Sequence, residues 1–230
     1  MPTEHLFATG AQAAADIATR NATLLAEGIA ARGVASIAVS GGRSPRPVLE
    51  ALSAVDLDWS KVVVTLVDER WVAPDSADSN ERLVRETLLQ GAAAKARFAP
   101  MKNDSPDAYA GQAAVEADFA TLPWPLDIIL LGMGDDGHTA SLFPEGTELA
   151  EGLASKTLTI AATPPVAPYQ RLSLTAHAIV QSRHIFLQIS GAGKKAVYDR
   201  ALAGGTVEEL PIRLALLQDD VPVEVWIADA

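Results

Sequence analysis

The sequence of 230 residues predicts an α/β fold, in which a mostly parallel sheet is covered by helices on both faces in a three-layer, Rossmann-like arrangement. Short apolar runs alternate with segments of helical spacing along most of the chain, which is typical of βαβ architecture. The run Ile128 to Leu131 is apolar throughout, as expected for a strand that is buried on both faces. Several runs end in a glycine-rich loop that opens a helix. No stretch resembles a linker, so a single domain over residues 1–230 is expected.

The first third of the chain supplies two strand, loop and helix units. Residues Ala8 to Ala31 are rich in alanine with apolar residues at helical spacing, and Gly33 is a natural helix stop. A strand follows from Val34 to Ser40. Pro45 suits the first turn of a helix that runs to Ser53. Lys61 to Val67 is the next expected strand.

The rest of the chain continues the alternation. Ser79 and Asn80 can cap a helix that runs through Leu88. Residues 91–103 read as a loop with a short strand, Ser105 to Phe119 as an amphipathic helix, and residues 152–169 as a region with one strand. The remaining elements are a strand at Arg171 to Thr175, a helix at Ala176 to Gln181, a strand at His184 to Ser190, a helix opened by Gly191 to Lys195, a helix at Pro211 to Leu217 and a strand at Val223 to Ala228.

Composition excludes several classes of function. The formal net charge is −11 and the pI is near 4.7, which argues against nucleic acid or an anionic membrane as a partner. The chain has no cysteine, so disulfides, thiolate catalysis and cysteine-ligated metal are excluded. The first residues lack the pattern of a signal peptide, and no apolar run reaches membrane-spanning length. A cytoplasmic protein is therefore expected.

The chemistry is expected in the loop that follows the strand at Ile128 to Leu131. Two carboxylates and an imidazole, Asp135, Asp136 and His138, follow within a glycine-rich turn. The spacing of Asp136 and His138 across Gly137 lets the carboxylate orient the ring, which is the pairing that a general base requires. The alternative is a polar turn with a surface histidine.

The same loop contains a misleading dinucleotide motif. Gly132, Gly134 and Gly137 spell G-x-G-x-x-G after a strand. That fingerprint brings a pyrophosphate against the loop, where Asp135 and Asp136 would repel it, and it normally opens the first βα unit of a domain. A dinucleotide cofactor is therefore not expected.

A second glycine loop, S-G-G-R-S-P at Ser40 to Pro45, is a candidate phosphate site. Gly41 and Gly42 free the backbone to turn N–H groups toward an anion, and Ser40 and Ser44 add hydroxyl groups. The loop lacks the lysine of a Walker motif. The alternative is a plain βα turn with a surface arginine.

Charged residues also follow two other strands. Asp68 and Arg70 come directly after Val67, and the carboxyl ends of strands line the ligand crevice in open α/β sheets. The two side chains could instead pair with each other. Lys194 or Lys195, at the start of a helix after Ser190, is a natural contact for an anion. Gln188 stands where the first glycine of a P-loop belongs, so ATP is not supported.

Taken together, these motifs resemble a known family. S-G-G-R-S-P at 40–45, V-D-E-R-W-V at 67–72, D-S-N at 78–80, G-M-G-D-D-G-H-T-A-S-L-F-P at 132–144 and R-L-S-L-T at 171–175 closely resemble the 6-phosphogluconolactonases, in the same order over nearly the whole chain. The glucosamine-6-phosphate deaminases and isomerases share this fold. Their version of the Asp-Gly-His turn is similar to D-G-H-I-A-F-N-E-P, in which a glutamate lies five positions after the histidine. This chain has Phe143 at that position. The resemblance therefore favours the lactonase branch.

The resemblance implies hydrolysis of 6-phosphoglucono-1,5-lactone to 6-phosphogluconate in the pentose phosphate pathway, with no metal and no organic cofactor. In that reaction His138 would activate water, Asp136 would orient the histidine, and Arg70 would lie near the lactone oxygen or the phosphate. The expected substrate and phosphate contacts are Ser40, Gly41, Gly42, Arg43, Ser44, Asp68, Arg171 and Lys194. A monomer is favoured. The alternatives are a deaminase or isomerase and a non-catalytic sugar-phosphate sensor, although sensors usually carry a DNA-binding segment, for which the chain has no basic arm.

Overall fold

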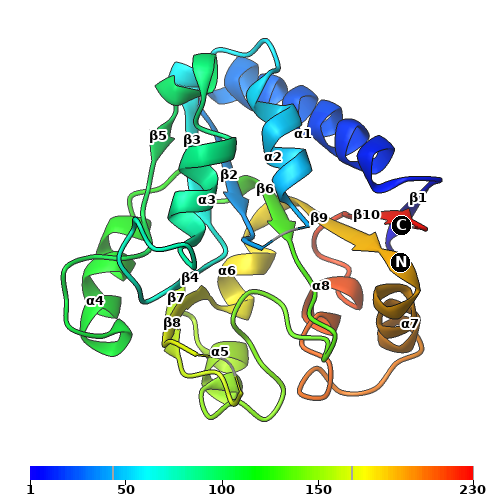
Figure 1. Cartoon of the computed structure of the whole chain (residues 1–230). Coiled ribbons are helices and arrows are strands. Elements are labelled where there is room, and N and C mark those ends of the chain that lie inside the picture. Colours follow the sequence, from blue (N-terminus) through cyan, green and yellow to red (C-terminus); the bar gives the residue numbers. More distant parts are fainter. Residues whose placement is uncertain (43, 167, 230) are drawn as a thin grey trace.

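The computed structural model describes residues 1–42, 44–166 and 168–229. Seven of the described strands form one parallel sheet in the order β1-β10-β9-β6-β2-β3-β5 (Figure 1). These strands are β1 (Thr3–Phe7), β2 (Ala35–Val39), β3 (Val62–Leu66), β5 (Arg97–Phe98), β6 (Leu126–Leu131), β9 (Ser182–Ser190) and β10 (Val223–Ala228). All residues of β2, β3 and β6 are buried, because helices cover both faces of the sheet. The predicted α/β fold is confirmed.

Three further strands form a small antiparallel sheet in the order β4-β8-β7, with β4 at Asp68–Arg70, β7 at Thr159–Ala162 and β8 at Arg171–Leu174. The expected strand from Lys61 to Val67 is therefore followed at once by a second strand in a different sheet. In the pairing of β4 with β8, Arg70 lies opposite Arg171. The two arginines come from distant parts of the sequence, and this register brings them together.

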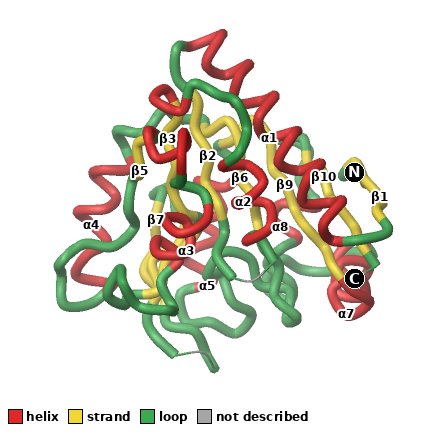
Figure 2. Tube along the Cα trace, turned by 45° about the horizontal axis from the view of Figure 1, so that its top comes forward, coloured by secondary structure: helices red, strands yellow, loops and turns green. Residues whose placement is uncertain are grey.

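The helices form groups that pack against the strands (Figures 1 and 2). The long helix α1 packs on β2, β6 and β10 and against α2, while α6 packs on β8 and β9. The described α-helices are α1 (Gly10–Arg32), α2 (Arg46–Ser53), α3 (Asn80–Thr87), α4 (Ala108–Phe119), α5 (Leu149–Ala154), α6 (Ala176–Val180), α7 (Gly191–Leu202) and α8 (Arg213–Leu216). Two short 3-10 helices lie at Trp59–Lys61 and Gly91–Lys95. No described helix is long and apolar enough to span a membrane.

Some elements differ from the sequence-based expectation. Strand β1 was not predicted, because its residues are mostly exposed at the sheet edge and lack an apolar pattern. Helix α5 was also missed. The expected helix at Pro211 to Leu217 is limited to α8 and follows a turn, and the helix expected from Ser105 begins at Ala108, where the side chain of Asp107 caps it.

Candidate active site

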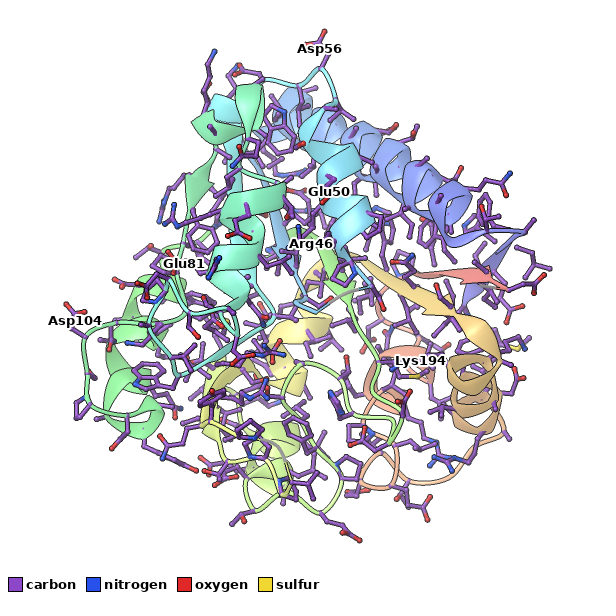
Figure 3. All side chains as sticks on the ribbon, in the orientation of Figure 1. Arg46, Glu50, Asp56, Glu81, Asp104 and Lys194 are labelled. Atoms are coloured by element: carbon purple, nitrogen blue, oxygen red, sulfur yellow. The ribbon has the colours of Figure 1, made fainter. Side chains whose placement is uncertain are left out.

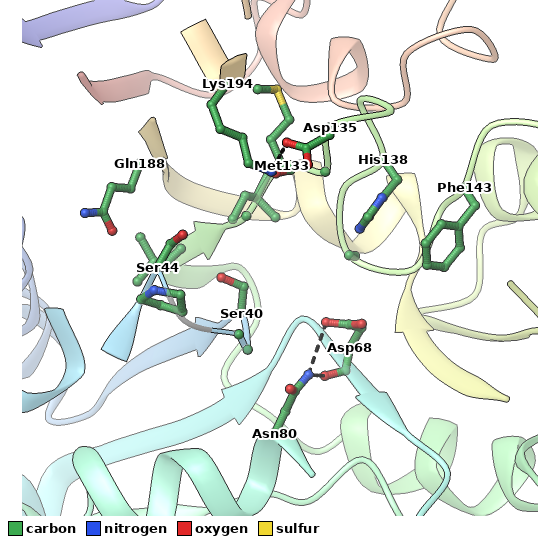
Figure 4. Close-up of a pocket in the computed structure, with 18 of the residues that line it drawn as sticks. Ser40, Ser44, Asp68, Asn80, Met133, Asp135, His138, Phe143, Gln188 and Lys194 are labelled. Atoms are coloured by element: carbon green, nitrogen blue, oxygen red, sulfur yellow. Dashed lines mark hydrogen bonds and ion pairs between the residues drawn. The ribbon is translucent and has the colours of Figure 1, made fainter. Parts of the chain in front are cut away.

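The cavity that holds most of the predicted residues has a volume of about 420 Å³ (Figure 4). It lies where the carboxyl ends of β2, β6 and β9 meet the small sheet. Residues from both sheets and from the first turn of α7 line it. This is the edge where open α/β sheets bind ligands.

The loop after β6 turns back on itself between Gly134 and His138. The backbone N–H of Gly137 donates to Gly134 O at 3.1 Å, and that of Gly134 donates to His138 O at 2.8 Å. Gly137 has a φ of 81°, which favours glycine. A Cβ on Gly134 would lie 2.1 Å from Nδ1 of His138 and 2.3 Å from Oδ1 of Asp136. The absence of a side chain at Gly134 therefore makes room for the His138 and Asp136 pair.

His138 and Asp136 form a hydrogen-bonded pair at the cavity. Nδ1 of His138 lies 2.6 Å from Oδ1 of Asp136, which also accepts the backbone N–H of His138 at 3.1 Å. The hydrogen bond from His138 lowers the pKa of Asp136 to about 2, so the carboxylate is ionised at neutral pH. An ionised partner requires the proton on Nδ1 and leaves Nε2 of the neutral ring as a proton acceptor. The ring of Phe143 packs on the imidazole, with centroids 4.4 Å apart.

Arg70 and Arg171 both line the cavity from the small sheet. Arg70 is held by Asp78, whose backbone oxygen accepts a hydrogen bond from the guanidinium at 2.7 Å. The Nε atoms of both arginines are buried without a hydrogen-bond partner among the described residues. Burial lowers the pKa of Arg171 from its high ordinary value, and the nearby carboxylate of Asp68 opposes the shift.

Asp68 is a buried acceptor that joins three segments. It accepts a hydrogen bond from Ser141 Oγ at 2.6 Å, and Arg171 lies 3.8 Å from the same carboxylate oxygen. The side-chain amide of Asn80 donates to the backbone oxygen of Asp68 at 2.8 Å. The alternative in which Asp68 pairs with Arg70 is not the arrangement found, since the ion-pair partner of Asp68 is Arg171.

The position of Arg70 is set by its neighbour Glu69. The carboxylate of Glu69 accepts the backbone N–H groups of Arg70, Asn80 and Glu81 and the hydroxyl of Ser79, at 2.7 to 3.0 Å. It thereby caps the first turn of α3 and ties β4 to it. Burial still raises the pKa of Glu69 on balance, against the effect of these hydrogen bonds.

The predicted phosphate loop also lines the cavity. Ser40, Gly41, Gly42 and Ser44 all face it, whereas Arg43 lies outside the described residues. A Cβ on Gly41 would lie 1.8 Å from the amide oxygen of Asn80, so the loop can approach α3 only with glycine there.

Of the two candidate lysines, Lys194 lies at the cavity. Its ammonium group contacts Met133 O and lies 3.2 Å from Oδ1 of Asp135. Lys195 instead pairs with Asp199 at 2.5 Å, away from the cavity.

The sequence reasoning missed several residues that line the cavity or hold one of its lining residues. Asn80, Ser141 and Gln188 are the clearest examples, since the first two hold Asp68 and the third lines the cavity. Gln188 had a detectable signal, because it is a polar residue within the otherwise apolar run from Ile185 to Ile189. Among the described residues no group of three His, Asp or Glu side chains is arranged to hold a metal ion.

Comparison with known proteins agrees with this geometry. The family described as glucosamine-6-phosphate isomerases/6-phosphogluconolactonase matches residues 8–224. A 6-phosphogluconolactonase of Pseudomonas putida is 46% identical over 96% of this chain and 91% of its own length, and one of Rhizobium meliloti is 43% identical over 97% of both. The crystal structure of a 6-phosphogluconolactonase from Shewanella baltica superimposes with a TM-score of 0.98 at 41% identity, covering 99% of this chain and 98% of the other. The chain therefore belongs to the glucosamine-6-phosphate isomerase/6-phosphogluconolactonase family.

Proposed function

We propose that this protein hydrolyses 6-phospho-D-glucono-1,5-lactone to 6-phospho-D-gluconate, using a water molecule that His138 activates. The observation that carries the proposal is the His138 and Asp136 pair, with its 2.6 Å contact, in a cavity that Arg70, Arg171 and Lys194 also line. The near full-length similarity to 6-phosphogluconolactonases supports the choice of substrate.

The first chemical step forms a bond between the water oxygen and the lactone carbonyl carbon. Nε2 of His138 accepts the proton that the water loses, while Asp136 holds the other nitrogen and stabilises the imidazolium. Negative charge develops on the carbonyl oxygen. The guanidinium groups of Arg70 and Arg171, which line the cavity, are the candidates to stabilise it.

The second step breaks the bond between the carbonyl carbon and the ring oxygen. The imidazolium returns its proton to the ring oxygen, which becomes a hydroxyl group, and the carbonyl carbon becomes a carboxylic acid that ionises. One water is consumed and His138 returns to its neutral form. The reaction requires neither electron transfer nor a cofactor.

We assign the phosphate of the substrate to the part of the cavity that the glycine loop and Lys194 line. Backbone N–H groups and hydroxyls of Ser40, Gly41, Gly42 and Ser44 and the ammonium of Lys194 are suited to a phosphate. Arg171 can reach the phosphate or the developing oxyanion.

A deaminase is disfavoured by what lies beside the histidine. Phe143 packs its apolar ring against the imidazole. It occupies the sequence position where the deaminases that share this fold have a glutamate. A sugar-phosphate sensor would not require an oriented imidazole.

The proposal is tested by measuring acid release from freshly generated 6-phosphogluconolactone, with a chelator present, against the spontaneous opening of the lactone. The protein should accelerate hydrolysis, and the chelator should not change the rate. Glucosamine 6-phosphate, as the control substrate, should release no ammonia. A rate equal to the spontaneous one would remove the enzymatic assignment and favour the sensor.

A further inference from the structure

Asp135 is an acidic residue in the basic part of the cavity, and the proposed hydrolysis gives it no role. It lies in the turn from Gly134 to Gly137, and its side chain is 88% exposed. Its carboxylate lies 3.2 Å from the ammonium of Lys194, whose side chain is 29% exposed. Figure 4 shows the side chains of Asp135 and Lys194 next to each other, beside Met133. The ammonium that we assign to phosphate therefore already has a carboxylate partner.

The turn does not depend on the side chain of Asp135. Its fold rests on the backbone hydrogen bonds between Gly134 and Gly137 and between Gly134 and His138, and on the pair of Asp136 and His138. Within the described parts of the chain, the Asp135 carboxylate pairs with Lys194. Its charge can therefore be removed while the general base stays in place.

A carboxylate and a phosphate compete for the same donors of an ammonium group. We propose that Asp135 competes with the phosphate of the substrate for Lys194, weakens the binding of phosphorylated ligands and so hastens release of the product. This inference rests on the proposed function, and it assigns to Asp135 the tuning of affinity at that site.

The competition should matter most for the product, because the product carries more negative charge than the lactone. Hydrolysis adds a carboxylate to a molecule that already carries a phosphate, so the product is more anionic than the lactone. Arg70, Arg171 and Lys194 would hold such a product strongly. A nearby carboxylate that re-forms its pair with Lys194 lowers that affinity.

The test is Asp135→Asn, which removes the charge and nearly keeps the shape. The KM for the phospholactone and the dissociation constant for 6-phosphogluconate, measured by calorimetry, should both fall roughly two- to fivefold, the upper part of the range expected for an exposed ion pair. The gain should shrink in high salt, because exposed charges are screened. The matched control is Asp199→Asn, which changes the net charge equally and breaks the pair with Lys195 outside the cavity. It should leave both constants unchanged.

A double-mutant cycle separates competition from general repulsion. In a Lys194→Met background, Asp135→Asn should change the affinity for 6-phosphogluconate by less than about twofold. A full gain in that background, or unchanged or weaker binding in Asp135→Asn itself, overturns the inference. Asp135→Ser gives a second reading if the Asn variant melts at a lower temperature than wild type. Because wild-type hydrolysis is measured separately, this inference can fail while the proposed function stands.

Discussion

The ionised carboxylate of Asp136 determines which nitrogen of His138 can accept a proton. Its pKa of about 2 lies below the ordinary value of 3.8, so its ionised form is favoured by folding. The resulting contribution to stability is present above pH 3.8 and is lost as the pH falls through about 2. Over the whole range in which an enzyme is normally assayed, Asp136 therefore stays charged, and the neutral ring of His138 carries its proton on Nδ1.

Replacing the base should affect turnover far more than binding. His138→Ala should lower kcat by about 10²- to 10⁴-fold with little change in KM, and Asp136→Asn should cause a smaller loss, because the ring keeps its Nε2 but loses its orientation. The loss in Asp136→Asn should persist at every pH well above the Asp136 pKa of about 2, because the wild-type carboxylate is ionised over that whole range. Steady-state kinetics against pH measure both effects. If His138→Ala keeps the wild-type kcat, the base lies elsewhere and Asp68 becomes the next candidate.

At the scale of elements, the loop between β6 and α5 positions the base through its glycines and through its attachment to the small sheet. Ser141 donates to Asp68 of β4, and its backbone N–H donates to Ser173 of β8 at 3.0 Å. Arg70 and Arg171 lie on the same two strands. The base and the cationic groups are therefore fixed to one another by buried hydrogen bonds.

A methyl group at Gly134 should separate the dyad. In Gly134→Ala the new Cβ would overlap Nδ1 of His138 and Oδ1 of Asp136, so either the ring or the carboxylate must move. We expect kcat to fall by about 10²-fold or more, approaching the His138→Ala value, with a dissociation constant for 6-phosphogluconate within a few fold of wild type. Kinetics and calorimetry on the same preparation provide the measurement. Gly193→Ala in α7 is the control, because an added Cβ there meets no atom within 4 Å. Wild-type kcat in Gly134→Ala would show that the dyad tolerates the displacement.

The sequence predicted the elements whose burial imposes a pattern. Strands β2, β3 and β6 are apolar because helices cover both sides, and α1 is long with regular apolar spacing. The small sheet was not predicted as a separate sheet, because pairing between β4 and β8 depends on contacts between residues about one hundred positions apart. For the same reason, the partners of Asp68 could not be read from the sequence. The choice of Lys194 over Lys195 required the orientation of α7.

At the scale of the whole molecule, the charge is distributed unevenly. The net charge is −11, yet the cavity gathers Arg70, Arg171 and Lys194. Figure 3 shows acidic residues such as Asp56 and Asp104 at the outer edge of the molecule, far from Lys194. An acidic surface does not attract an anionic substrate, so its capture depends on these few local charges.

Phosphate should therefore be an essential handle for the substrate. Glucono-1,5-lactone without phosphate should be hydrolysed with a kcat/KM lower by about 10²-fold or more, because charge-assisted hydrogen bonds to the phosphate are each worth roughly 1.5 to 3 kcal/mol. Lys194→Ala should raise KM for the phospholactone about tenfold or more with kcat less affected, and should leave kcat/KM for the unphosphorylated lactone nearly unchanged. Lys195→Ala, one residue away and paired with Asp199, is the matched control and should behave as wild type on both substrates.

Arg171→Ala distinguishes the two roles open to that residue. A loss confined to the phosphorylated lactone assigns Arg171 to the phosphate, and an equal loss on both lactones assigns it to the oxyanion. Equal kcat/KM of the wild type for the two lactones would contradict the assignment of Lys194 and of the glycine loop to phosphate.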